Sequence, residues 1–209
     1  MMNGIVLAGG LSTRMGHDKA ALPWGDSDLL NTVIERLSPV CKRLIVVSNL
    51  ERKITLPGVQ VVADHYKLCG PLGGMQAGLA ASDADYNFIA ACDMPYLNTA
   101  AVAYIRQAAE GYDAAVPYID GHYNPLHGVY RQTCLHYIDR LLAEQNYRIL
   151  NFYSQIKMRH ITVEELRQFD PELMTLSNAN TPDDYEELKT RSSESRDGAS
   201  EVKNATKGN

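Results

Sequence analysis

A polar, glycine-rich stretch near the amino terminus contains the residue types that bind a phosphate chain. Residues 5–8 form a short apolar, β-prone run, and Gly9 and Gly10 begin the loop that follows it. Glycines let the backbone come close to a ligand and turn its N–H groups towards an anion. Arg14 and Lys19 add positive charge where a triphosphate would lie. The alternative is an ordinary strand-to-helix turn with two solvated cations, but the two basic side chains at this spacing favour phosphate binding.

A single acidic residue, Asp93, follows the most apolar strand that the sequence predicts, over residues 88–92. A carboxylate at the tip of a buried strand needs a partner, because a buried unpaired charge is costly. A divalent cation is a natural partner beside a triphosphate, since Mg²⁺ is held by one or two carboxylates together with phosphate oxygens. An ion pair with Lys19 or a cap on the next helix are the alternatives. We expect Asp93 to bind the metal and to share one site with Lys19.

These residues require an open α/β sheet that places the ends of several strands side by side. Short apolar runs that alternate with helical periodicity predict a three-layer α/β/α fold with a doubly wound, mostly parallel sheet, to which the late strands add an antiparallel edge. Besides residues 5–8, strands are predicted over residues 44–47, 59–63, 88–92, 114–116 and 158–163. Helices are predicted over residues 29–37, 75–81, 99–107, 131–144 and 183–188.

The length and composition predict one domain over residues 1–189 followed by a tail. The chain has 209 residues, enough to bury a substantial core. Residues 190–209 contain almost no hydrophobic side chains, so they cannot offset the entropy of ordering, and we expect a disordered tail.

Charge, apolar runs and cysteine spacing argue against several classes of protein. The net charge of −5 disfavours nucleic acid, whose binders usually present a basic face. No apolar run approaches the roughly 20 residues that span a bilayer, so no membrane contact is expected. The first predicted strand starts close to Met1, which leaves no room for a signal peptide and predicts a cytoplasmic protein. The cysteines form no CxxC pair and are expected to be buried, reduced thiols: Cys41, Cys69, Cys92 and Cys134.

Two further polar residues stand where predicted strands end. Asn49 follows residues 44–47, and Asp64 follows residues 59–63. The carboxyl ends of strands are where open α/β sheets bind ligands. From position alone, a loop cap explains Asn49 equally well, and a helix or loop cap is the better explanation of Asp64. The glycine-rich run at residues 70–74 precedes a predicted helix, whose first N–H groups would face the same edge.

The first loop, LAGGLSTRMGHDKAAL at residues 7–22, resembles the signature loop of the molybdenum cofactor guanylyltransferase (MobA) family. GPLGGMQAGL at residues 70–79 and CDMP at residues 92–95 are similar to two further elements of that family. Related enzymes that make CDP- or UDP-linked products usually carry Leu-Ala-Ala-Gly where this chain has Leu-Ala-Gly-Gly. The resemblance therefore implies that the missing methyl group at Gly9 leaves room for a purine. It implies a Rossmann-like nucleotidyltransferase fold and the following nucleotide contacts: Leu7, Ala8, Gly9, Gly10, Lys19, Asn49, Asp64 and Asp93.

The resemblance also implies where the second substrate binds. NPLHGVY at residues 124–130 is similar to the family segment that faces the acceptor, and NANTP at residues 178–182 is similar to a box that precedes the last helix. The implied acceptor-binding residues are Asn124, Pro125, Leu126, His127, Asn178 and Asn180. A cap on the last helix, with Pro182 in its first turn, is an equally good explanation of the two asparagines.

The resemblance implies an enzyme that transfers GMP from GTP to the terminal phosphate of molybdopterin, with Mg²⁺ as cofactor. Arg14, Lys19 and Asp93 would be its catalytic residues, and no residue is arranged as a covalent nucleophile. Proteins that deliver the cofactor or receive the product are conceivable partners. The alternatives are a cytidylyltransferase acting on molybdopterin or another phosphorylated acceptor, and a non-catalytic regulator that only binds nucleotides.

Overall fold

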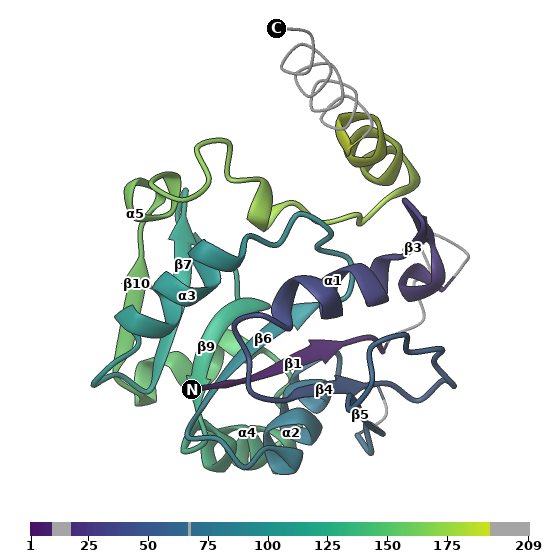
Figure 1. The fold of residues 1–209 in the computed structure, drawn as a ribbon. Helices are drawn as coiled ribbons and strands as arrows, with labels where there is room; N and C mark the ends of the chain where they lie inside the picture. Colours follow the sequence, from purple (N-terminus) through teal and green to yellow (C-terminus); the bar gives the residue numbers. More distant parts are fainter. Residues whose placement is uncertain (10–17, 67, 193–209) are drawn as a thin grey trace, which may run out of the picture.

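The computed structural model describes residues 1–9, 18–66 and 68–192. Its central eight-stranded sheet has the order β10-β7-β9-β6-β1-β4-β5, with β8 paired to β7 (Figure 1). These strands are β1 (Asn3–Leu7), β4 (Leu44–Val47), β5 (Gln60–Val62), β6 (Tyr86–Ala91), β7 (Ala114–Ile119), β8 (His122–Tyr123), β9 (His127–Arg131) and β10 (Met158–Ile161). A separate hairpin consists of β2 (Pro23–Trp24) and β3 (Ser27–Asp28).

Helices cover both faces of the sheet. The α-helices are α1 (Leu29–Leu37), α2 (Pro71–Ala81), α3 (Thr99–Ala108), α4 (Cys134–Ala143) and α5 (Val163–Arg167), and residues 182–192 form a closing helix. The 3-10 turns are η1 (Lys19–Ala21), η2 (Ile149–Gln155) and η3 (Met174–Leu176). Asp28 and Asn98 cap α1 and α3, because each side-chain oxygen accepts a hydrogen bond from an N–H in the first turn of the helix.

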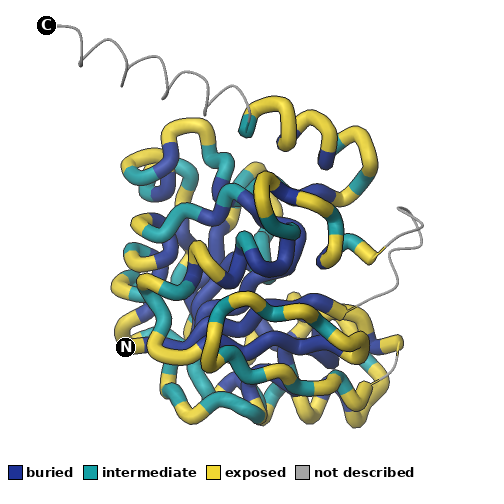
Figure 2. The backbone as a smooth tube through the Cα atoms, turned by 45° about the vertical axis from the view of Figure 1, so that its right-hand side comes forward, coloured by how far each residue is buried: buried dark blue, intermediate teal, exposed yellow. Residues whose placement is uncertain are grey.

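The alternation of side chains along the strands separates the core into two layers. In β1, Val6 packs with α1 and α3, whereas Ile5 and Leu7 pack with α2 and α4. Figure 1 shows the two helix pairs on opposite sides of the sheet, and Figure 2 shows the buried strands between partly exposed helices. Because consecutive side chains of a strand point to opposite faces, one short apolar strand supplies both layers. The three-layer, mostly parallel α/β fold predicted from the sequence is confirmed.

The sequence places the antiparallel strand at the edge of the sheet, and this position is wrong. β9 runs antiparallel to both β6 and β7 and lies inside the sheet, whereas the edge strand β10 is parallel to β7. β9 therefore begins, rather than ends, beside the carboxyl end of β6, where Ala90 pairs with His127. The prediction of a helix from residue 131 was also wrong, because Arg131 ends β9 and α4 starts at Cys134.

The closing helix extends further than the sequence predicts. It runs to residue 192, so residues 190–192 are helical, and the expected tail overlaps the described part of the chain by these three residues. The remaining positions, 193–209, lie outside the described residues. Within the described ranges, no helix is long and apolar enough to cross a membrane. No disulfide joins the four cysteines, all of which lie in the described ranges, and all except the half-buried Cys41 are buried.

Candidate active site

Lys19, Asp93 and Asn180 meet at the carboxyl edge of the central strands. Lys19 Nζ lies 3.1 Å from Asp93 Oδ2 and 3.2 Å from Asn180 Oδ1, and it donates a hydrogen bond to each oxygen. Asp93 follows β6, and Lys19 begins η1. Lys19 and Asp93 therefore lie together, and Asn180 joins them from the segment before the closing helix. Their contact is the ion pair that is the alternative to a metal site, so metal binding by Asp93 stays a prediction.

Backbone hydrogen bonds fix the position of Asp93. The N–H of Cys92 donates to the carbonyl of Leu7 at 3.1 Å, which continues the pairing of β6 with β1 by one residue. The carbonyl of Asp93 accepts a hydrogen bond from the N–H of Ala179 at 2.9 Å. The segment that carries Asn178 and Asn180 is thereby held beside the end of β6.

Two oxygens at this site have the chemistry of metal ligands. Asp93 Oδ1 and Asn178 Oδ1 are buried, and neither has a hydrogen-bond partner among the described residues. Carboxylate and amide oxygens are hard donors of the kind that Mg²⁺ prefers, and this ion needs few protein ligands when it also binds phosphates. The described part of the chain holds no cluster of three or more His, Cys, Asp or Glu that could bind a metal without a substrate. The donor set fits a cation that binds together with a phosphate ligand.

The predicted nucleotide contacts at the end of β1 differ in how accessible they are. The side chains of Leu7 and Ala8 are buried, and both carbonyls already accept hydrogen bonds, from Cys92 N–H and from Arg52 respectively. Gly9 is the first exposed residue after the strand, and a Cβ atom there would have only the carbonyl of Val47, 3.9 Å away, as a described neighbour. Gly9 is therefore the most accessible of the three residues, and the nucleotide contacts predicted at Leu7 and Ala8 stay predictions. Gly10 and Arg14 lie outside the described residues.

Asn49 and Asp64 form one folded loop beside α2. Asn49 Oδ1 accepts a hydrogen bond from the N–H of Asp64 at 2.8 Å, and Asp64 Oδ1 accepts one from the N–H of Tyr66 at 2.8 Å. A Cβ atom on Gly73 would lie 2.9 Å from Asp64 Oδ1, so the carboxylate rests against the first turn of α2. Both side chains act as loop caps in this structure, and their contact with a nucleotide stays a prediction.

The acceptor residues predicted at β9 are divided between surface and core. Asn124, Pro125 and Leu126 are half-buried at the start of β9, on the same edge of the sheet as Asp93. His127 is fully buried and packs edge-on against Phe88. Its burial lowers the pKa of the ring to about 3, which keeps the ring neutral. His127 is thus the member of the predicted acceptor set whose ring belongs to the core, and its contact with an acceptor stays a prediction.

Sequence reasoning missed Arg52. Its side chain is 6% exposed, and it donates to Ala8 O at 2.6 Å and to Ser48 Oγ at 2.9 Å, while it also pairs with Asp18. The sequence did contain a signal, because Arg52 is a charged residue shortly after the buried strand β4. The same kind of position, after β6, identified Asp93.

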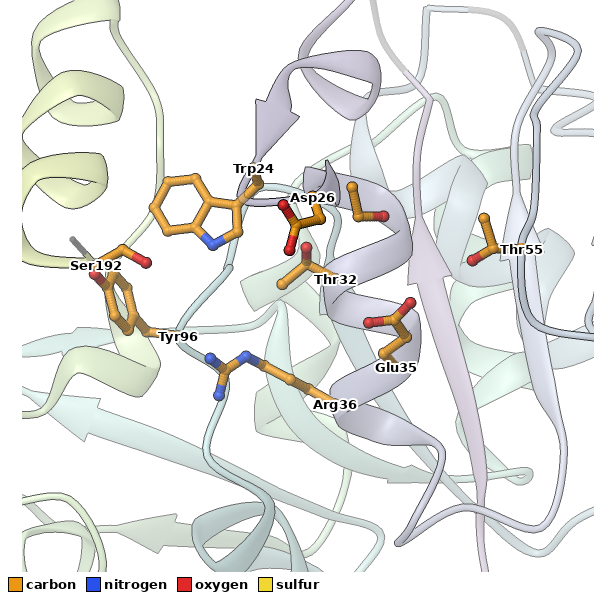
Figure 3. Close-up of a pocket in the computed structure, with 9 residues that line it drawn as sticks. Trp24, Asp26, Thr32, Glu35, Arg36, Thr55, Tyr96 and Ser192 are labelled. Atoms are coloured by element: carbon orange, nitrogen blue, oxygen red, sulfur yellow. The ribbon is translucent and has the colours of Figure 1, made fainter. Parts of the chain in front are cut away.

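The structure also contains a hollow of about 690 Å³ away from these residues. It lies between the β2–β3 hairpin, α1 and the closing helix, and Figure 3 shows its lining. It is lined by Trp24, Asp26, Ser27, Thr32, Glu35, Arg36, Thr55, Tyr96 and Ser192. None of the predicted site residues belongs to it, so we place the chemistry at Lys19 and Asp93 instead.

A doubly wound sheet with a cation and a carboxylate at the carboxyl edge of its central strands defines a nucleotide-binding α/β protein. A family model described as the MobA-like NTP transferase domain matches residues 4–168. The chain belongs to this family of nucleotidyltransferases.

Individual relatives agree with this assignment. The chain is 32% identical over 195 residues to a probable molybdenum cofactor guanylyltransferase of Pelotomaculum thermopropionicum, covering 93% of this chain and 95% of that protein. It is 32% identical to a molybdenum cofactor guanylyltransferase of Desulfosudis oleivorans, covering 88% and 93% of the two chains. The crystal structure of molybdopterin-guanine dinucleotide biosynthesis protein A from Archaeoglobus fulgidus matches with a TM-score of 0.79 and 25% identity, covering 92% of this chain and 100% of that chain.

Proposed function

We propose that this enzyme transfers GMP from GTP to the terminal phosphate of molybdopterin, or of its molybdenum-containing form, with Mg²⁺ as cofactor. The products are the guanine dinucleotide form of the cofactor and pyrophosphate. The observation that carries the proposal is the meeting of Lys19, Asp93 and Asn180 at one sheet edge in a chain of the MobA-like NTP transferase family. The names of the relatives supply the substrates.

The reaction needs two anions held in line and their charge neutralised. An oxygen of the acceptor phosphate attacks the α-phosphorus of GTP and forms the new P–O bond. The bond from the α-phosphorus to the bridging oxygen of the β-phosphate breaks, and pyrophosphate leaves with that electron pair.

The residues of the site have distinct roles in this step. Lys19, together with Arg14, binds the triphosphate and stabilises the departing pyrophosphate. Asp93 and Asn178 would hold Mg²⁺ through their unpaired oxygens, and the bound ion would neutralise phosphate charge. Cys92 does not serve as a nucleophile, because burial and the neighbouring Asp93 raise the pKa of its thiol to about 12.

Gly9 supports GTP over CTP as the donor. Its missing Cβ atom would touch no described atom closer than 3.9 Å, so the packing of the protein does not require glycine there. The space beside Gly9 therefore favours a larger base. A cytidylyltransferase remains the alternative enzyme, and competition between GTP and CTP for the site separates the two.

The test is titration calorimetry of GTP and CTP, with and without Mg²⁺, on the wild type and on Asp93→Ala. We expect GTP to bind more tightly than CTP and Mg²⁺ to strengthen its binding only when Asp93 is present. Pyrophosphate release with molybdopterin as acceptor should fall about 10²- to 10³-fold in Asp93→Ala, as for the loss of one electrostatic group at other active sites.

Asp139→Ala is the matched control, because Asp139 is an exposed carboxylate on α4. It should leave binding and turnover unchanged. Binding of GTP without any pyrophosphate release in the presence of acceptor would identify a nucleotide-binding regulator instead. Preference for CTP in the wild type would contradict the choice of donor.

A further inference from the structure

Arg52 is a buried cation for which the proposed reaction has no role. Each of its three guanidinium nitrogens contacts a different oxygen. Nε donates to Ser48 Oγ at 2.9 Å, Nη2 donates to Ala8 O at 2.6 Å, and Nη1 pairs with Asp18 Oδ2. The group thus joins the end of β4, the end of β1 and the residue that precedes η1. Ala8 and Asp18, which are ten positions apart in the sequence, therefore both contact one guanidinium group.

Asp18 connects this group to Lys19. Its other oxygen, Oδ1, accepts a hydrogen bond from the N–H of Ala20 at 3.2 Å and caps η1. Lys19 is the first residue of η1, and its Nζ reaches Asp93. A continuous series of contacts therefore runs from Arg52 through the carboxylate of Asp18 to the turn that carries Lys19.

We propose that Arg52 is a positioning residue for guanylyl transfer, which acts through Asp18 to set the direction in which Lys19 presents its ammonium group. The planar fork of arginine suits this role, because it can bind three acceptors in fixed directions, whereas lysine presents a single point charge. The sheet does not depend on these contacts. β4 is held by its ladders with β1 and β5, and Ser48 N–H continues the pairing with Val62 O at 2.9 Å.

The first arm of the test is kinetic and rests on the proposed function. Arg52→Ala should lower kcat/KM for GTP about 10- to 100-fold, the size expected when a reacting group is misplaced by about an ångström. Asp18→Asn keeps an oxygen for the cap but loses the ion pair, and Arg52→Lys restores only one contact, so both should have intermediate values. In a Lys19→Ala background, Arg52→Ala should change kcat/KM by no more than about twofold, because its effect passes through Lys19.

The second arm does not need the reaction at all. The side chain of Lys19 is 18% exposed in its pair with Asp93. An amine-reactive reagent followed by mass spectrometry measures how fast Lys19 is modified without nucleotide, relative to the exposed Lys42. Arg52→Ala and Asp18→Asn should each increase the relative rate at Lys19 several-fold.

Arg43→Ala is the matched control, since Arg43 precedes the opposite end of β4 and pairs at the surface with Asp83 and Gln60. It should change neither kcat/KM nor the modification of Lys19. Thermal denaturation shows whether each variant is folded. If Arg52→Ala does not fold, Arg52→Lys and Asp18→Asn take its place in both arms of the test. Unchanged modification of Lys19 in folded Arg52 and Asp18 variants would overturn the proposal, whatever the kinetics. A different outcome is a wild-type protein that never turns over GTP, while the Arg52 and Asp18 variants still show faster modification of Lys19. That result would support the positioning of Lys19 by Arg52 and refute the proposed function.

Discussion

His127 shows how burial determines what a single polar residue can do. Its Nε2 lies 3.3 Å from Thr175 Oγ1, and its Nδ1 has no hydrogen-bond partner among the described residues. The same type of residue in an exposed loop would be a candidate for substrate binding or proton transfer. In the core, beside Phe88, it is a neutral aromatic ring that packs a strand against its neighbours.

The buried ring makes stability depend on pH. Burial lowers the pKa of His127 to about 3, whereas an unfolded histidine has a pKa of about 6.5. Between these values the unfolded chain binds the proton and the folded chain does not. The contribution of the neutral ring is therefore complete above about pH 6.5 and is lost as the pH falls towards 3. We expect this residue to lower the free energy of unfolding by up to about 1.4 kcal/mol per pH unit in that window.

Urea denaturation of the wild type and of His127→Leu, between about pH 7 and about pH 4, measures this slope. The variant should show a smaller decrease than the wild type. His136→Leu is the control, because His136 is exposed on α4, and its slope should match the wild type. Parallel pH profiles for the wild type and His127→Leu would contradict the buried neutral ring.

At the scale of elements, α2 lies unusually close to β1. A Cβ atom on Gly78 would be 2.3 Å from Ile5 Cγ2, and one on Gly74 would be 3.2 Å from Leu7 Cδ2. Gly78 is therefore needed for this packing, and Gly74 has little spare space beside Leu7. The helix packs directly on β1, the strand that leads to Gly9, and this packing fixes the distance of the first turn of α2 from the site.

Gly78→Ala tests this contact. The overlap with Ile5 should cost about 1–3 kcal/mol, against a gain of about 1 kcal/mol for removing a glycine from a helix. We expect a lower free energy of unfolding in urea denaturation. Gly9→Ala is the control for stability, because its Cβ atom would meet no described atom closer than the carbonyl of Val47 at 3.9 Å, and it should unfold at the wild-type urea concentration. A neutral or stabilising Gly78→Ala would show that α2 can move away from the sheet.

The sequence predicts those elements whose local pattern agrees with their final surroundings. β4 and β6 are apolar because both faces are covered, so their composition alone identifies them. β9 lacks such a pattern. It contains Gly128, where a Cβ atom would lie 2.9 Å from Val116 Cγ2, so this strand needs a glycine for close approach, a residue that normally indicates a loop. Its position between two parallel strands depends on pairing that no local pattern records.

The same reasoning separates the predicted site residues from the missed one. Asp93 and Lys19 were found because each stands beside a recognisable strand end. Arg52 gains its role from acceptors that lie 34 and 44 positions away in the sequence, at Asp18 and Ala8. Only the folded sheet brings these together.

At the scale of the whole molecule, the closing helix packs against the β2–β3 hairpin near the amino terminus. Trp24, the single tryptophan, packs edge-on against Tyr96 and Tyr185, with ring centroids 5.7 and 6.1 Å apart. Tyr96 OH donates to the carbonyl of Leu188 at 2.7 Å, and Tyr185 OH donates to the carbonyl of Pro23. This small cluster is distinct from the two layers on the main sheet. It anchors the closing helix and, through it, the segment that brings Asn180 to Lys19.

The closing helix should therefore come loose before the sheet unfolds. Leu188→Ala removes a buried side chain of the cluster, at a cost of about 2–5 kcal/mol for such a truncation. We expect the fluorescence of Trp24 to change at a lower urea concentration than in the wild type, with a smaller shift in far-UV circular dichroism. Leu166→Ala, in a main layer, should shift both signals together. Coincident shifts in Leu188→Ala would show that the cluster and the sheet unfold as one unit.

The pairing of Lys19 with Asp93 has a consequence for which ligands the site accepts. Each charge already has its opposite 3.1 Å away, so an anion that arrives alone competes with the carboxylate of Asp93 for the ammonium group of Lys19. A polyphosphate that arrives with its own cation brings a replacement for both partners at once. We therefore expect the site to bind a bare anion less tightly than a polyphosphate that carries a cation.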